Sequence, residues 1–367
     1  MPNNNSEEPL PLAGEAAPAP VSIPDDSVSE VNDQLASTTL SDQDEATPPA
    51  DAAAGDTNNP KEDPDLWKPH PPKEECPVCL VPLPLKNEQS IYWSCCGKKI
   101  CNACREEHKR ALNVTNRKRE KKKLPPLEFT CPFCRSPLAE NDAEVISRHE
   151  DRVDKGDTVA MLNLAGMYMN GTHGLQEDET KQLELFHRAA DLGSKEANLV
   201  IGRCFLFGQV GVKRDEEKAR EWFESALKKG DVEARNMLAI LLADEDNEDN
   251  YGLVIEHWHL AAAAGHDDSV KNLWNCFSMG KLSKPGLEKA LRAHKAASDE
   301  MKSEERERFA AYEEAQAGND ELLKHIYGSY YLGYINAKDL KVALKAHRAG
   351  DRMAVEILLQ NKIYTDK

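Results

Sequence analysis

The sequence predicts a multidomain chain with three parts: a disordered N-terminal tail, a small cysteine-rich domain, and an all-α array of helical repeats. Three observations lead to this prediction. Thirteen of the 21 prolines fall in residues 1–73, eight of the ten cysteines fall in residues 74–140, and an apolar helical pattern returns after 37 residues from about residue 156. A chain of 367 residues is long enough for two or three such parts.

The predicted tail, residues 1–73, is acidic and poor in large apolar side chains. It carries fifteen acidic and three basic residues, and its proline-rich stretches show neither helical nor strand periodicity. Such a segment cannot bury enough apolar surface to offset the entropy lost on ordering. The sequence shows no secretory signal and no run of the ~18 apolar residues that a membrane span needs. We therefore expect no membrane partner and a cytoplasmic or nuclear location, where thiols stay reduced.

The net charge of −17 disfavours nucleic acid as a partner, although the cysteine-rich region itself is basic. The one dense basic run, RKREKKK, spans Arg117–Lys123. This run is compatible with a nuclear-import signal, with a nucleic-acid patch, or with a solvated loop or helix end inside the domain. It lacks the interleaved aromatic residues that favour binding to single strands.

The cysteines of the second part come in four close pairs. Three pairs have the spacing Cys-x2-Cys and one pair is adjacent; the pairs are Cys76 and Cys79, Cys95 and Cys96, Cys101 and Cys104, and Cys131 and Cys134. Adjacent cysteines fit disulfide geometry poorly. Eight thiolates are enough for two tetrahedral zinc sites, and closed sites of four cysteines are structural rather than catalytic. The sequence therefore predicts two Zn²⁺ ions in residues 74–140.

The order CPVC, CC, CNAC, CPFC resembles a RING finger. This is a small α+β domain in which ligand pairs one and three hold one zinc and pairs two and four hold the other, an arrangement called a cross-brace. The resemblance implies two sites, one made of Cys76, Cys79, Cys101 and Cys104, and one made of Cys95, Cys96, Cys131 and Cys134.

The sequence departs from the common RING pattern at its second cysteine pair. Lys98 stands where that pattern has a histidine, and an amino group cannot ligate while protonated. The all-cysteine RING variant shares the spacing from Cys96 to Cys101 but has one more residue between its third and fourth ligands. If one adjacent cysteine does not bind, His108 or water is the alternative ligand. A FYVE finger also has a cross-brace, but its basic, histidine-rich motif is absent from SIYWSCC.

A RING finger of a ubiquitin ligase holds a ubiquitin-charged E2 enzyme in a reactive arrangement and forms no covalent intermediate. By this resemblance, Val78 and Pro132 would contact the E2, and Arg135 would donate to both the E2 and ubiquitin. The helix after the sixth ligand lacks the aromatic residue that often adds to this contact. Two functions stay open: a RING-type E3 ubiquitin ligase, and a zinc-stabilised adaptor without activity.

The third part repeats a helix–loop–helix unit. Each unit contributes two alanines, an aromatic residue and a closing glycine. The sets are Ala160, Phe186, Ala189 and Gly193; Ala197, Phe223, Ala226 and Gly230; and Ala234, Trp258, Ala261 and Gly265. Small residues let helices approach closely while large ones fill the seam, and a single unit cannot bury its apolar face alone. The pattern therefore predicts a stacked solenoid.

This part is similar to Sel1-like repeats, relatives of the tetratricopeptide repeat, across roughly residues 156–350. The resemblance is strongest in the unit IGRCFLFGQVGVKRDEEKAREWFESALKKG. The array is most regular over 156–265 and degenerate over 266–350, where ALRAH is echoed by ALKAH. The resemblance implies a scaffold that binds a protein client. We also expect Trp258 in the core between two exposed histidines, and a long solvated helix from MKSEERERFAAYEEA.

Overall fold

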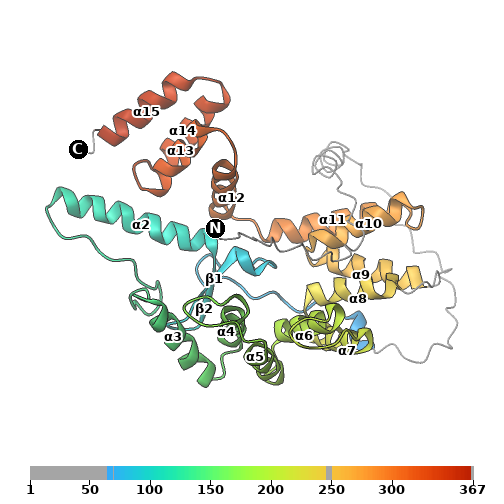
Figure 1. The fold of residues 1–367 in the computed structure, drawn as a ribbon. Helices are drawn as coiled ribbons and strands as arrows, with labels where there is room; N and C mark the ends of the chain where they lie inside the picture. The colour runs from blue at the N-terminus through green and yellow to red at the C-terminus, as the bar shows by residue number, and fades with distance from the viewer. Residues whose placement is uncertain (1–63, 69, 245–249, 365–367) are drawn as a thin grey trace, which may run out of the picture. The chain divides into compact units, whose positions relative to one another are not determined.

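The computed structural model describes residues 64–68, 70–244 and 250–364 (Figure 1). A small cysteine-rich region with a β-hairpin is followed by an all-α array of Sel1-like repeats, as predicted. The predicted tail lies outside the described residues except near its end. There the structure differs from a free tail, because Pro64–Trp67 form a 3-10 turn, η1, and Leu66 is buried.

The cysteine-rich region is built on a short antiparallel hairpin. Its elements are η2 (Asn87–Gln89), β1 (Ser90–Trp93), β2 (Lys98–Cys101) and α2 (Asn102–Lys121). Ser90 pairs with Cys101 and Trp93 pairs with Lys98. Trp93 and Ile100 are buried together with four of the cysteines, so sulfur atoms and apolar side chains share one small core.

The helices of the array follow one another along the chain, and consecutive helices pack together from α3 to α11 and from α12 to α15 (Figure 1). They are α3 (Asp142–Asp154), α4 (Thr158–Asn170), α5 (Glu179–Asp191), α6 (Lys195–Phe207), α7 (Glu216–Lys228), α8 (Val232–Asp244), α9 (Tyr251–Ala263), α10 (Asp267–Ser278), α11 (Lys284–Glu300), α12 (Glu304–Ala317), α13 (Glu321–Tyr331), α14 (Ala337–Arg348) and α15 (Arg352–Tyr364).

The regular repeats pack through small residues, as the sequence predicts. A Cβ atom on Gly202 of α6 would lie 2.6 Å from the ring of Phe223 of α7, so the two helices meet at a distance that only glycine allows. Ala219 and Ala226 are fully buried beside this ring. The helices begin at side-chain caps such as Asp178, Ser194 and Asp215, each of which accepts a backbone N–H of its own helix.

The degenerate half keeps a structural echo. His294 of α11 lies 3.1 Å from Asp267 at the start of α10, and His347 of α14 lies 2.7 Å from Asp320, which caps α13. Both pairs link the second helix of a unit to the beginning of the first. The two histidines therefore make equivalent contacts in the two units, which agrees with the echo of ALRAH by ALKAH.

The charged helix α12 is not the solvated helix that the sequence predicts. Arg306 donates to the carbonyl oxygens of Pro82 (2.7 Å) and Val81 (3.2 Å), and the ring of Phe309 packs against the cysteine-rich core. The prediction was wrong on this face because its partners are more than 200 residues away in the chain, where helical periodicity carries no information.

The long helix α2 lies against α12 and α13 (Figure 1). The guanidinium of Arg110 lies 4.0 Å from the ring centre of Tyr330, and that of Arg117 lies 3.1 Å from the ring centre of Tyr334. The basic run Arg117–Lys123 covers the end of α2 and the turn after it, which fits its interpretation as a helix end; the nuclear-import and nucleic-acid interpretations stay predictions.

The hairpin and the start of the array are joined by a polar contact. Asp157, the N-cap of α4, accepts hydrogen bonds from the hydroxyl of Tyr92 in β1 (2.7 Å) and from the guanidinium of Arg152 in α3 (2.7 and 3.0 Å). Burial alone would raise the pKa of Asp157, but the hydrogen bonds from Tyr92 and Arg152 outweigh burial and hold this pKa below 3.8. Among the described helices, none is long and apolar enough to cross a membrane.

We predict that Asp157→Asn lowers the free energy of unfolding by about 1–3 kcal/mol, because asparagine keeps the cap but loses the charge that pairs with Arg152. Thermal melting measures this loss. Since the folded-state pKa lies below the unfolded value, the stabilisation is complete above pH 3.8 and is lost as the pH falls further. Asp215→Asn, at the half-buried cap of α7, is the matched control. Equal losses in both variants would contradict the prediction.

Candidate metal centre

The eight clustered cysteines lie in two groups of four. In the first group, Cys76 and Cys79 from the loop before the hairpin meet Cys101 and Cys104 at the end of β2 and the start of α2. The Sγ atoms of Cys76 and Cys104 are 3.8 Å apart, and those of Cys79 and Cys101 are 4.0 Å apart. The first cysteine pair of the sequence is therefore grouped with the third.

The second group joins the turn of the hairpin to the last cysteine pair. The Sγ atoms of Cys96 and Cys131 are 3.6 Å apart, and those of Cys95 and Cys134 are 3.4 Å apart. The turn brings both adjacent cysteines into the group, because the N–H groups of Cys96 and Gly97 donate to the carbonyl of Trp93 and Gly97 adopts a φ of 73°.

The first and last cysteine pairs sit in loops of the same construction. In the first loop, the N–H of Leu80 donates to the carbonyl of Cys76 (2.8 Å); in the last loop, the N–H of Arg135 donates to the carbonyl of Cys131 (3.0 Å). Leu80 and Arg135 have φ values of 58° and 61°, a left-handed conformation that turns the chain sharply after the second cysteine. Each loop thus directs two sulfur atoms toward one point.

The distances within both groups fit a tetrahedral metal ion. Four sulfurs bound to zinc at about 2.3 Å lie about 3.8 Å from one another. All ligand atoms of each group lie within 4.8 Å of one another, and the pairs above span 3.4–4.0 Å. Each group could therefore hold one metal ion.

One thiol of each group is acidified by its neighbours. A hydrogen bond from Cys104 lowers the pKa of Cys101, and hydrogen bonds with Ser136 lower the pKa of Cys134. Burial raises the pKa of Cys95 and of Cys96. A metal ion binds thiolates, and the lowered pKa gives each group at least one sulfur that ionises readily. The raised pKa values mean that four thiolates do not accumulate in a group unless a cation is bound.

His108, the alternative ligand, lies apart from these groups, and Lys98 stands where the common RING pattern has a histidine. The ring of His108 bonds to the carbonyl of Thr130 (3.1 Å), and Lys98 is exposed on β2. His108 belongs to neither cysteine group. Sequence reasoning missed Arg306 of α12, whose guanidinium lies 3.7 Å from the sulfur of Cys79. The only feature of the sequence that drew attention to Arg306 is the charged stretch MKSEERERFAAYEEA, in which it lies.

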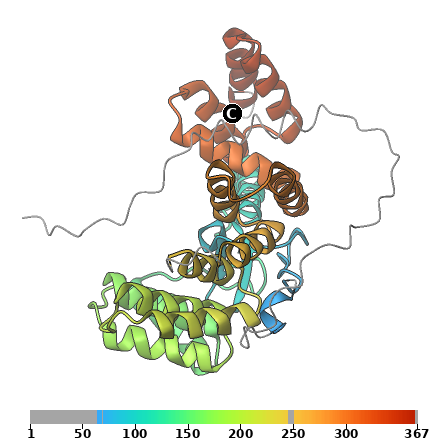
Figure 2. The ribbon, with the colours of Figure 1, turned by 90° about the vertical axis from the view of Figure 1, so that its right-hand side faces the viewer.

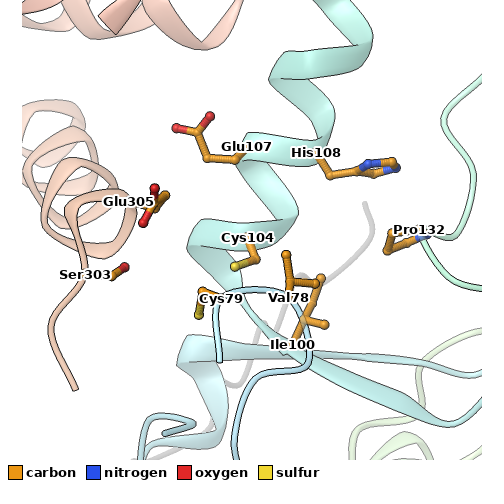
Figure 3. A pocket seen from close by; sticks show the side chains of 9 residues that line it. All are labelled: Val78, Cys79, Ile100, Cys104, Glu107, His108, Pro132, Ser303 and Glu305. Atoms are coloured by element: carbon orange, nitrogen blue, oxygen red, sulfur yellow. The ribbon is translucent and has the colours of Figure 1, made fainter. Parts of the chain in front are cut away.

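A hollow of about 440 Å³ opens beside the first cysteine group (Figure 3). Val78 and Pro132, from the first and last cysteine loops, line it together with Ile100 and with Glu107 and His108 of α2. On the opposite side, Ser303 and Glu305 come from the beginning of α12. The hollow therefore has an apolar floor and a polar rim.

The three residues singled out for E2 contact differ in exposure. The side chain of Val78 is 49% exposed, Pro132 is half-buried, and Arg135 is exposed. Two of the three line the hollow, and Arg135 follows the last cysteine directly. All three lie on the two cysteine loops of similar construction.

The comparisons with known proteins concern the array. A family model described as the Sel1 repeat matches residues 158–194 and 195–231, which cover α4 to α7. These residues are Sel1 repeats. The match does not extend to the cysteine-rich region, and no curated protein matches the chain.

Two solved structures are similar to part of the chain. A Sel1 repeat protein from Oxalobacter formigenes is 26% identical with a TM-score of 0.32, and the match covers 36% of this chain and 98% of that one. A protective antigen of uropathogenic Escherichia coli that displays an SLR fold is 18% identical with a TM-score of 0.28, and the match covers 69% of this chain and 60% of that one.

We predict that the chain purified with zinc holds about two ions, and that Cys96→Ser and Cys131→Ser each lower this to about one. Elemental analysis of the desalted protein measures the content. Both residues belong to the second group, so the double variant should also retain one ion. Cys204→Ala, in the buried core of the array, serves as the control and should keep two ions. Unchanged content in Cys96→Ser would remove this residue from the site.

Proposed function

We propose that residues 74–140 form a RING-type domain with two Zn²⁺ ions, and that this domain positions a ubiquitin-charged E2 enzyme. The helical repeats, within residues 156–350, would bind the protein client. The observation that supports this most strongly is the interleaved grouping of the cysteine pairs, one with three and two with four. Two ions bound in this way tie together loops that are far apart in the sequence.

Zinc is the metal that this donor set favours. Eight thiolates in two closed groups of four suit a soft, tetrahedral ion, and neither group leaves a position for a substrate. The ions would therefore be structural. Their ligands would be Cys76, Cys79, Cys101 and Cys104 for the first ion, and Cys95, Cys96, Cys131 and Cys134 for the second.

The surface beside the first group supports the E2 assignment. A FYVE finger would share the cross-brace, but the residues that a RING finger uses for the E2 recur here as Val78, Pro132 and Arg135. The hollow between Val78 and Pro132 is open, and an exposed arginine stands at the last cysteine. A planar guanidinium suits the role of bridging two carbonyl acceptors on different proteins.

Such a domain accelerates transfer without forming a bond to ubiquitin. It would hold the thioester of the charged E2 close to the attacking amine, which is catalysis by proximity and orientation. In this chain Arg135 would restrain ubiquitin, while Val78 and Pro132 would seat the E2. The proposed location is the cytoplasm or the nucleus, where the ligating thiols stay reduced.

One observation favours a second function, a zinc-stabilised adaptor without activity. Ser303 and Glu305 of α12 border the same hollow, and Glu107 of α2 is already bonded to Tyr330 of α13 (2.8 Å). An approaching E2 would meet α12 as well as the cysteine loops. If α12 blocks the approach, the domain serves to hold the helices in place.

We predict that the full chain accelerates the discharge of ubiquitin from a charged E2 to free lysine, and that Arg135→Ala lowers the rate roughly tenfold or more, as the loss of a charge-assisted hydrogen bond implies. Val78→Ala should act in the same direction by weakening E2 binding. The assay uses a broad panel of E2 enzymes and measures thioester decay.

The matched control is Leu138→Ala, which removes an apolar side chain of the same 49% exposure outside the hollow. It should leave the rate unchanged. No acceleration across the panel by a chain that holds two zinc ions would reject the ligase and favour the adaptor.

A further inference from the structure

A short segment of the chain lies on the helical repeats as a bound peptide would. Leu66 and Trp67 end the turn η1, and residues 70–72 contain no helix or strand. They contact α7 and residues of α8 and α9 (Figure 2 shows η1, in blue, beside this part of the array). Leu66 is 5% exposed, although it lies more than 160 residues away in sequence from Arg235 of α8, which it contacts.

Arg235 is the centre of this contact. Its side chain is 1% exposed, and it donates to the carbonyl oxygens of Leu66 (2.9 Å) and Lys68 (3.0 Å) and to Nε2 of His70 (2.9 Å). Within the described part of the chain, no carboxylate pairs with it. A buried charge is costly unless its donors are satisfied, and here the satisfied donors point at the segment.

Aromatic and apolar contacts surround this arginine. The ring of Trp67 lies 4.4 Å from the ring of His257 of α9, centre to centre. A Cβ atom on Gly230, at the turn between α7 and α8, would lie 2.3 Å from Pro71. The expectation that both histidines beside Trp258 are exposed was therefore wrong for His257, which is 2% exposed beneath Trp67.

We propose that the surface of α7, α8 and α9 around Arg235 is a binding site for a proline-flanked peptide that carries a leucine–tryptophan pair in a 3-10 turn, followed by a histidine. In this chain residues 66–68 and 70–72 occupy the site in cis, and a client with the same pattern competes for it. The inference rests on the proposed client-binding role of the repeats and is independent of the ubiquitin chemistry.

The pattern of contacts explains this choice of ligand. Arg235 bonds to main-chain carbonyls, which any peptide offers, while Leu66, Trp67 and His70 fill places that suit only certain side chains. The flanking sequence P-D-L-W-K-P-H-P-P-K holds four prolines. Prolines restrict the free peptide and lower the entropy lost when it binds.

The test uses a fluorescent peptide of residues 64–74 and the full chain with Leu66→Ala and Trp67→Ala, which weaken the cis occupant. Fluorescence anisotropy measures binding. The variant should bind the peptide at least tenfold more tightly than the wild type does, because the tethered segment competes at an effective concentration on the order of millimolar. Adding Arg235→Leu to the variant should abolish binding, and a peptide with Trp67→Ala serves as the control ligand.

A folded variant that binds no peptide at millimolar concentration would overturn the proposal and make the segment a fixed part of the array. Melting temperature and zinc content of the variant establish that it is folded. If the variant does not fold, hydrogen exchange of the wild type decides. Opening of residues 66–74 while α8 and α9 stay protected supports an exchangeable ligand, and opening only together with these helices rejects it.

A pH series gives an independent readout. Burial, and then the charge of Arg235, lower the pKa of His70 from 6.5 to about 4; Lys195 and Lys73 act in the same direction, and the carbonyl of Gly230 opposes them. The free peptide therefore takes up a proton that the bound peptide excludes, and binding should be roughly tenfold weaker at pH 5.5 than at pH 7.5. A peptide with His70→Gln should lose this dependence; an equal dependence in both peptides would contradict the role of His70.

Discussion

The convergence of eight thiols in so short a region is the constraint on which the rest of the structure depends. Two strands of four residues and a handful of buried apolar side chains make a core too small to hold several long loops by itself. Sulfur atoms 3.4–4.0 Å apart would repel one another as thiolates, so a cation in each group would both remove the repulsion and supply the missing cohesion. The two cysteine groups fix the positions of the loops that carry Val78 and Arg135.

The helical array contacts this small domain near both of its ends as well as in its middle, where Leu85 packs against Val232 and Ala261. Near its beginning, Asp157 and Arg152 bind Tyr92 of the hairpin; near its end, α12 and α13 pack on α2, where Arg110 and Arg117 lie against tyrosine rings. The basic side chains in the last turn of α2 complement the helix dipole, but the main reason for the stability of a helix in a protein is tertiary packing. The helices α12 and α13 supply that packing, and it places Glu305 at the hollow that an E2 would enter.

Sequence reasoning was successful where spacing alone decides the structure. The cysteine pairs, the helix–loop–helix period and the small residues between packed helices are local patterns, and each corresponds to a local feature of the fold. It failed where a partner lies far along the chain. The burial of His257 beneath Trp67, and of the charged face of α12 against Pro82, depends on contacts across more than 180 residues. The composition of residues 64–73, rich in proline and charge, predicts a disordered tail. Composition contains no information about the tertiary contacts that these residues make.

The contacts of Arg235 explain why the docked segment is an exchangeable ligand rather than a permanent structural part of the array. An apolar side chain would hold two parts of a domain together at a lower cost in free energy, because burying a guanidinium carries a desolvation penalty that burying an apolar side chain does not. Burial lowers the pKa of Arg235 to about 10. The buried guanidinium donates its hydrogen bonds to main-chain carbonyls and to one histidine. Such bonds can be remade with any peptide that presents the same groups. The segment lies only a few residues before Cys76, so its release would free the chain next to the first cysteine loop and link occupancy of the repeats to the surface that carries Val78.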